Sequence, residues 1–337
     1  MNPRFPEAQQ VTDIYVINPF ATNGNGFTPP EGATVLYTEA DREANIKNLG
    51  ALLTGEAAYR VRVAAGDGTV AWAMEASVQS GQEVDISVKK GGYKNDMAAM
   101  VAEAGGRIAV SPLVLERRQE HDDADPTWEL ERMIAYSYGL GAIAVGAKMA
   151  NSKEEFRTEK AALIERIRNF RDKLAAFGVP KRLVNPEFWG SKITDAKLAL
   201  GMLRSEVEIE GRRYPTHVTM DGRKLGAFIA SNGNMMSGGW MGFMFQKLHQ
   251  EGFVTSTVGR SIPGRMMGMS ARMVRLHPFK DRWVRGATLP FEVNETTLAQ
   301  ADGEDFIQAR GTYRIREFGK TLVTLSVEAE ANGPDPS

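Results

Sequence analysis

Three short apolar runs in the first hundred residues, at positions 14–17, 61–64 and 84–88, constrain the fold of this chain more than any other feature. Each run is followed by a turn rich in glycine or asparagine, and clear helical patterns follow the second and third turns. Strand–turn–helix units of this spacing favour a parallel sheet, whose ligands lie beyond the carboxyl ends of the strands. The sequence therefore predicts an α/β domain in which the three turns gather on one rim.

The pattern changes after about residue 108, and we expect a domain boundary near residues 110–115. Residues 152–177 have helical periodicity, and Ser152 and Glu155 are spaced as in a capping box. After residue 205, short runs with β character alternate with turn signals. These features predict a second domain that is a β-sandwich or a barrel.

The composition of the 337 residues excludes several classes of protein. With 41 Lys and Arg against 42 Asp and Glu, the formal net charge of −1 provides no basic field for holding nucleic-acid phosphates. The absence of cysteine excludes disulfide scaffolds, thiolate metal sites and cysteine nucleophiles, and it fits a cytoplasmic location. The N-terminus lacks the apolar region of a signal peptide, and the most apolar stretch, at 135–147, is too short to span a membrane. We therefore expect a cytoplasmic protein without a transmembrane segment.

The second turn carries a nucleotide-binding motif. Gly66-Asp67-Gly68-Thr69-Val70-Ala71 matches the G-x-G-x-x-A pattern of dinucleotide-binding domains, and Asp85 follows at the spacing of a ribose-binding acid. A dehydrogenase of that fold is therefore one alternative. A carboxylate between the two glycines repels a pyrophosphate unless a cation lies between them, so Asp67 suits a magnesium-bound nucleotide better. A purely structural glycine turn, with Thr69 as the cap of the next helix, is the other alternative.

Several common catalytic motifs are missing from the chain. It contains no P-loop, no H-E-x-x-H zinc motif and no G-x-S-x-G nucleophile elbow. The four histidines show no spacing that indicates a zinc site or a catalytic triad, and we expect them to be structural: His121, His217, His249 and His277.

Six short motifs, taken in order, carry a resemblance that no single one of them carries. They are Asn18-Pro19 followed by Gly24-Asn25-Gly26, Gly66 to Thr69, Gly92 to Asp96, Gly139-Leu140-Gly141, Asn232-Gly233 with Gly238-Gly239, and Asp302-Gly303-Glu304. In order and spacing they resemble the diacylglycerol kinase catalytic-domain family, which includes bacterial lipid kinases and the sphingosine and ceramide kinases. The resemblance covers about residues 12–330.

The resemblance implies a fold and a division of the chain. The N-terminal α/β domain, of the NAD kinase and diacylglycerol kinase type, would cover residues 1–112 and be completed by the return of residues 306–333. A C-terminal β-sandwich domain, which would bind the lipid, would cover residues 113–305 with a helical insertion at about 152–204. The active site would lie between the two domains.

The resemblance also implies roles for individual residues. Glu304 would be the general base that removes a proton from the lipid hydroxyl, and Asp67 would be a catalytic residue that holds Mg²⁺. The residues expected to contact ATP are Asn18, Pro19, Phe20, Ala21, Thr22, Thr38, Gly66, Asp67, Gly68, Thr69, Asn95 and Asp96. For Thr38, a role as the cap of the following helix is an equal alternative. The function implied is transfer of the γ-phosphate of ATP to a hydroxyl of a diacylglycerol-like or sphingoid lipid.

Two departures from the family pattern keep other functions open. Tyr93-Lys94 replaces a nucleotide-contacting threonine and its glycine neighbour in the third turn, and Met266-Met267-Gly268 stands where bacterial members hold a structural metal. A degenerate regulator that binds nucleotide or lipid without turnover is therefore one alternative, and an NAD kinase-like enzyme is another.

The partners follow from the same reading. Eight of the 16 methionines lie between positions 235 and 273, beside aromatic residues, and they would suit an acyl chain or a bilayer surface, although an ordinary methionine-rich core explains them as well. We expect peripheral contact with a membrane that presents the lipid, and we expect no nucleic acid partner. A homodimer is left open.

Overall fold

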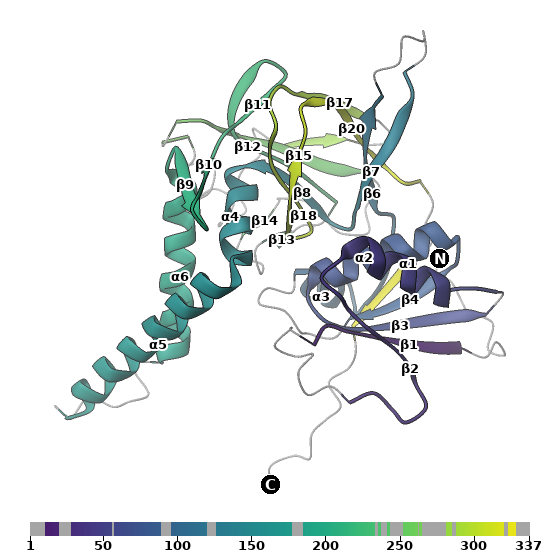
Figure 1. Cartoon of the computed structure of the whole chain (residues 1–337), viewed down its shortest axis with the longest axis horizontal. Coiled ribbons are helices and arrows are strands. Elements are labelled where there is room, and N and C mark those ends of the chain that lie inside the picture. The colour runs from purple at the N-terminus through teal and green to yellow at the C-terminus, as the bar shows by residue number, and fades with distance from the viewer. Residues whose placement is uncertain are drawn as a thin grey trace.

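The computed structural model describes residues 11–19, 28–55, 57–88, 96–119, 126–176, 185–232, 235–236, 241–242, 252–261, 263–264, 281–284, 288–319 and 323–327. Two large sheets dominate the structure (Figure 1). No helix in these ranges is long and apolar enough to cross a membrane.

The first sheet has six strands in the order β2-β1-β3-β4-β21-β5. The strands are β1 (Val11–Ile17), β2 (Thr34–Tyr37), β3 (Ala58–Ala64), β4 (Val84–Val88), β5 (Arg107–Val110) and β21 (Val323–Val327). All neighbours are parallel except β5, which is antiparallel to β21. The predicted parallel sheet is therefore confirmed.

The carboxyl ends of the three predicted strands lie side by side. Ile17 of β1 pairs with Ala64 of β3, and Val63 of β3 pairs with Val88 of β4. The strand ends thus share one rim, whereas most of the first turn, at 20–27, and the third turn, at 89–95, lie outside the described residues.

Three helices pack on the face of this sheet that is turned toward the second sheet (Figure 1): α1 (Arg42–Leu52), α2 (Asp67–Ser80) and α3 (Asp96–Glu103). Asp41 is the N-cap of α1, because its carboxylate accepts hydrogen bonds from the N–H groups of Glu43 and Ala44. The alternative in which Thr38 caps this helix is therefore wrong. The backbone N–H of Thr38 instead donates to the carbonyl of Ile17, 2.9 Å away, at the end of β1.

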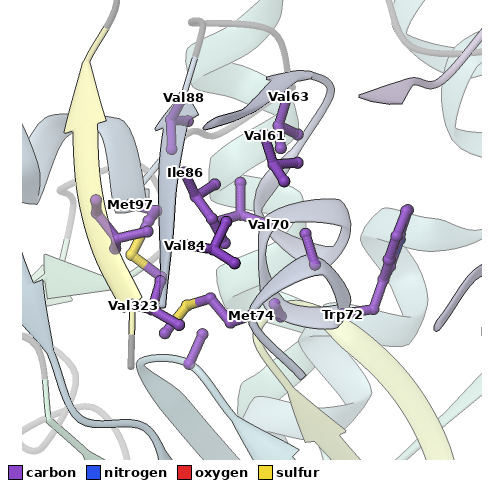
Figure 2. Close-up of a cluster of buried hydrophobic side chains, with 14 of the residues drawn as sticks. Val61, Val63, Val70, Trp72, Met74, Val84, Ile86, Val88, Met97 and Val323 are labelled. Carbon is purple, nitrogen blue, oxygen red and sulfur yellow. The ribbon is translucent and has the colours of Figure 1, made fainter. Parts of the chain in front are cut away.

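The core of the first sheet is made of β-branched strand residues and apolar residues of α2 and α3 (Figure 2). Val61, Val63 and Ile86 are almost fully buried against Val70 and Met74 of α2. Because α2 also contacts β7 (Trp128–Ile134) of the second sheet, it is buried along most of its length. This burial holds the beginning of α2 firmly between the two sheets.

The second sheet has eleven strands, and every neighbouring pair is antiparallel. Nine follow the order β19-β18-β8-β12-β11-β17-β20-β6-β7, and β15 pairs with both β12 and β16. The strands are β6 (Leu113–Arg118), β7 (Trp128–Ile134), β8 (Ser137–Gly141), β11 (Val218–Met220), β12 (Arg223–Ser231), β15 (Phe253–Gly259), β16 (Asp281–Val284), β17 (Leu289–Val293), β18 (Thr297–Ala301), β19 (Glu304–Gln308) and β20 (Gly311–Glu317).

The β-rich second part of the chain is therefore as predicted, with its main strands joined in one continuous sheet around an aromatic core of Tyr138, Phe228, Phe291 and Tyr313. Of the segment expected to return to the first domain, β21 lies in the first sheet and β20 in the second. Two small hairpins complete the strands: β9 (Glu206–Ile209) with β10 (Arg212–Pro215), and β13 (Met235–Met236) with β14 (Met241–Gly242).

Three helices follow β8: α4 (Ala142–Asn151), α5 (Lys153–Ala176) and α6 (Pro186–Leu203). The pair α5–α6 extends away from both sheets (Figure 1). The helix predicted at 152–177 is thus confirmed within one residue at each end. The hydroxyl of Ser152, however, donates to the carbonyl of Lys148 at 3.0 Å, so it serves the end of α4. The side chain of Glu155, the other half of the predicted capping box, lies outside the description.

Candidate active site

The Gly66–Thr69 motif forms the junction between β3 and α2. Gly66 is the N-cap of α2, and its carbonyl accepts the N–H groups of Thr69 at 3.0 Å and Val70 at 3.3 Å. Thr69 therefore lies inside the first turn, and the alternative in which it caps the helix is wrong. The beginning of a helix carries partial positive charge, which favours a bound anion such as a phosphate.

Glu304 lies directly on this turn, although it is 236 positions away in the sequence. A Cβ atom built on Gly68 would lie 2.7 Å from Glu304 Oε1 and 2.9 Å from its Cγ. Any side chain at position 68 would thus displace Glu304, so this close approach requires glycine. The structure brings together two of the residues that the sequence singled out, at the place where the two sheets meet.

Two arginines that the sequence analysis did not identify hold Glu304. Nε of Arg42, at the start of α1, lies 3.3 Å from Glu304 Oε2, and Nη1 of Arg132, on β7, lies 3.5 Å from the same oxygen. Arg42 also pairs with Glu75 of α2 at 2.5 Å. The signals in the sequence were faint: Arg42 follows a helix cap, and Arg132 lies in a charged strand without a motif. Their convergence depends on how three distant segments pack.

The electrostatic environment of Glu304 combines opposing effects. The surrounding protein desolvates the carboxylate and raises its pKa, whereas Arg42 and Arg132 act to lower that pKa. The net pKa lies above the usual value for glutamate. About 37% of the side chain remains exposed to solvent, so a substrate can reach it.

Asp302 shapes the turn that carries Glu304. It adopts a φ of 53°, is buried, and accepts hydrogen bonds from the backbone N–H groups of Ala135, Tyr136 and Ser137 at 2.7–2.9 Å. Burial raises the pKa of Asp302 to about 6, although these three bonds and Arg42 oppose the shift. With its carboxylate occupied by the backbone, Asp302 positions the turn between β18 and β19.

Helix α4 holds the same turn from the other side. The amide of Asn151 donates to the carbonyl of Gly303 at 2.8 Å and to Asp305 Oδ1 at 3.0 Å. Lys148 lies 3.2 Å from Asp305. The turn is therefore fixed at both ends, and Glu304 between them has a defined position.

Asp67 faces the N-terminus of α3 and the β7–β8 connection. Its Oδ1 accepts the N–H of Met97 at 3.1 Å, and the hydroxyl of Tyr136 lies 3.4 Å from Oδ2. Tyr136 also binds Asp302 through its backbone N–H, so one residue links the two acidic side chains. Its carbonyl accepts the hydroxyl of Ser231 and the N–H of Asn232, whereas the rest of that motif, Gly233 and Gly238-Gly239, lies outside the described residues.

The glycine pair of β8 supports this arrangement without reaching the α2 turn. Gly141 has a φ of +70°, and a Cβ there would lie 2.6 Å from the carbonyl oxygen of Gly226. A Cβ added to Gly139 would lie 2.8 Å from Cγ2 of Ile143. These two positions need glycine because α4 and β12 pack closely on β8.

The remaining expected nucleotide contacts are described in part. Asn18 follows β1 and donates its N–H to the carbonyl of Ala64 at 3.4 Å, beside the Gly66 turn, and the exposed Pro19 comes next. Thr38 is buried at the end of the neighbouring strand β2. Asp96 begins α3, next to Met97, which binds Asp67. Three further residues, Phe20, Ala21 and Thr22, lie outside the described residues, as do Asn95, Tyr93, Lys94 and Met266 to Gly268.

Asp85 lies far along its strand from this site. It is the second residue of β4, at the amino end, and its carboxylate pairs with Arg60 at 3.6 Å and Arg107 at 3.4 Å. A ribose-binding acid of a dehydrogenase is required at the carboxyl end of a strand. Asp85 therefore cannot serve as the ribose-binding acid that the dehydrogenase alternative requires.

The described part of the site is compatible with a Mg²⁺ ion that is bound to nucleotide phosphates. Within the described ranges, no group of three His, Cys, Asp or Glu side chains could hold a metal ion. A Mg²⁺ ion that arrives with phosphates needs only one or two protein carboxylates, however. Asp67, in the first turn of α2, is a carboxylate that would meet this requirement.

Comparison with known proteins places the fold. No protein-family model matches the chain, and no curated protein sequence matches it. Three solved structures from Bacillus anthracis match across 94% of this chain and 97% of theirs. One is described as a diacylglycerol kinase (12% identity, TM-score 0.50), and two as candidate diacylglycerol kinases (13% and 14% identity, TM-scores 0.54 and 0.55). The chain has the fold of these proteins.

Proposed function

We propose that the chain is an ATP-dependent kinase that transfers the γ-phosphate to a hydroxyl group of a diacylglycerol-like or sphingoid lipid. The observation that carries this proposal is the contact of Glu304 with Gly68, which sets a carboxylate on a turn suited to phosphates. Phosphoryl transfer depends mainly on positioning and on charge neutralisation, so a phosphate cradle and one well-placed base are the essential parts. The shared fold with diacylglycerol kinase structures supports a lipid as the acceptor.

In this proposal the first turn of α2 holds the nucleotide phosphates. Asn18 to Thr22, Thr38, Gly66 to Thr69, Asn95 and Asp96 complete the nucleotide site. The carboxylate of Glu304 takes the proton of the lipid hydroxyl, and the hydroxyl oxygen attacks the γ-phosphorus. The bond between the γ-phosphorus and the bridging oxygen breaks, and ADP leaves with that electron pair. Mg²⁺ held by Asp67 would neutralise charge on the phosphates when it is bound.

The location of the reaction belongs to the same proposal. Its acceptor is a membrane lipid, and the protein would therefore work in the cytoplasm and bind a membrane surface peripherally. The methionine-rich segment that would suit acyl chains lies mostly outside the described residues.

A non-catalytic regulator is the second candidate, and one observation favours it. Two guanidinium groups pair with Glu304 in this structure, and such pairing weakens a carboxylate as a base. The regulator would bind nucleotide without turnover.

A phosphate-transfer assay separates these candidates. The protein is incubated with γ-labelled ATP, Mg²⁺ and mixed micelles of diacylglycerol, monoacylglycerol, sphingosine or ceramide, and in parallel with NAD as the acceptor. We expect label in one lipid, a large loss of label with Glu304→Gln, and no loss with Glu206→Gln, a surface carboxylate paired with Arg213. Label in NAD would show that the acceptor is a dinucleotide and not a lipid. Nucleotide binding without transfer to any acceptor would identify a regulator.

A further inference from the structure

The two arginines on Glu304 differ in how firmly they are held. Arg42 has a second carboxylate, Glu75, at 2.5 Å, and Glu75 also accepts the amide of Gln79. For Arg132, Glu304 is the only carboxylate paired with it among the described residues, and its guanidinium otherwise lies over the ring of Phe306, 4.3 Å from the centroid. A second ion pair therefore anchors Arg42 beside Glu304, whereas no second carboxylate among the described residues restrains Arg132.

Arg132 is also the less compensated of the two charges. The side chains of both arginines are more than four-fifths buried. Burial and the positive charge of Arg42 lower the pKa of Arg132, whereas Glu75 and Glu304 raise the pKa of Arg42 above its usual value despite burial. A guanidinium in this position gains from an additional anion nearby.

The α2 turn is where such an anion would bind. Gly68 and Arg132 contact the same carboxylate, that of Glu304, from different elements. A phosphate bound at the turn would therefore lie close enough to Arg132 for a small movement of its side chain to reach it. Arginine suits this task because its planar fork binds phosphate oxygens through two parallel hydrogen bonds. The ring of Phe306 offers a surface along which the guanidinium can shift while it keeps its cation–π contact.

We propose that Arg132 exchanges Glu304 for the terminal phosphate of a bound nucleoside triphosphate, so that this residue distinguishes a triphosphate from a diphosphate and leaves the Glu304 carboxylate with one guanidinium partner instead of two. The proposal rests on the proposed kinase function. Arg42 stays beside Glu304, with its Nε 3.3 Å from Oε2, while Oε2 loses one of its two cations. The same movement that binds the phosphate thus makes Glu304 a better proton acceptor.

Nucleotide binding tests the exchange without any turnover. Affinities of the full-length protein for the non-hydrolysable triphosphate AMP-PNP and for ADP are measured by calorimetry in the presence of Mg²⁺. We expect Arg132→Gln to weaken AMP-PNP binding by about 10- to 100-fold, the usual effect of losing a charge-assisted hydrogen bond, and to leave ADP binding within about twofold. Arg213→Gln, which removes a surface arginine with its own ion pair, should change neither affinity.

Three results would overturn the proposal in distinguishable ways. Equal losses for AMP-PNP and ADP would make Arg132 a general structural residue, and unchanged affinities would make it a partner of Glu304 alone. If the unmutated protein bound neither nucleotide, the kinase function itself would fail together with the exchange. Should Arg132→Gln fail to fold, Arg132→Lys carries the test, since it keeps the charge without the fork and should weaken AMP-PNP several-fold while ADP binding is unchanged.

Discussion

We expect Gly68→Ala to lower activity without lowering stability. The new methyl carbon would lie 2.7 Å from Glu304 Oε1, 2.9 Å from Cγ and 3.1 Å from Cδ. Ordinary contacts of a Cβ atom begin near 3.4 Å, so Oε1 must move by about 0.7 Å, Cγ by about 0.5 Å and Cδ by about 0.3 Å. Because Arg42 and Arg132 both pair with Oε2, that movement also perturbs both ion pairs.

The substitution should lower the rate of phosphate transfer but should not lower the free energy of unfolding. Displacing a catalytic group by about 1 Å typically costs about 100-fold in rate, so we expect these smaller displacements to lower the rate of phosphate transfer by roughly 10-fold. Alanine is more favourable than glycine inside a helix by about 1 kcal/mol, and position 68 lies in the first turn of α2. The free energy of unfolding should therefore stay within about 1 kcal/mol of the original value or rise.

Rate and stability are measured on the same preparations, the first by transfer of label from ATP to the lipid and the second by urea unfolding. Glu304→Asp provides the matched second substitution, because it removes Oε1, which makes the shortest contact with the new methyl group. The double variant should lose less activity than the product of the two single losses predicts. Full activity in Gly68→Ala would refute the inferred role of the Gly68–Glu304 contact, and a large loss of stability would refute the separation of the two effects.

Three further predictions concern the segments that hold the site. Gly141→Ala should destabilise the protein by about 2 kcal/mol or more, because φ is +70° and the methyl group would lie 2.6 Å from a backbone oxygen. The control Gly50→Ala has open space around the new methyl group and should be neutral or stabilising. Equal unfolding midpoints for the two variants would contradict this prediction. Since the folded pKa of Asp302 is about 6, above the unfolded value of 3.8, the folded state binds more protons between these pH values. Stability relative to Asp302→Asn should therefore fall by up to about 3 kcal/mol as pH rises from 4 to 6, and a pH-independent difference would argue against a buried, proton-binding Asp302. Asn151→Ala should lower the rate of phosphate transfer several-fold and leave nucleotide affinity unchanged, because it frees only the turn that carries Glu304; an equal loss of affinity would contradict that role.

The predictable part of the fold came from patterns that are local in the chain. Runs such as 84–88 are short, β-branched and followed by glycine turns, and they became strands whose ends share a rim. The helix at 152–177 followed from its period. Helix caps were predicted less well, because Asp41 and Gly66 rather than Thr38 and Thr69 occupy those positions, and the choice depends on the backbone angles at which each helix begins.

The candidate site was predictable where a motif named its residues. Asp67, Gly68 and Glu304 were identified from short sequences, and the structure brings them together. Arg42 and Arg132 were missed because an arginine in a charged helix or strand has no signature of its own. The division of roles between Asp302 and Glu304 was equally hidden, since it depends on three backbone N–H groups more than 160 positions away.

By itself, the sequence determined the elements, the glycine turns and the identities of the chemical groups, because strand period, turn chemistry and side-chain type act over a few residues. Only the tertiary structure decided which of these groups meet. Glu304 reaches Gly68 because the β18–β19 turn is pinned to the β7–β8 connection, and it acquires two guanidinium partners because α1 and β7 converge there. Contacts of this kind arise from the packing of two sheets around α2, and no pattern within a single segment encodes them.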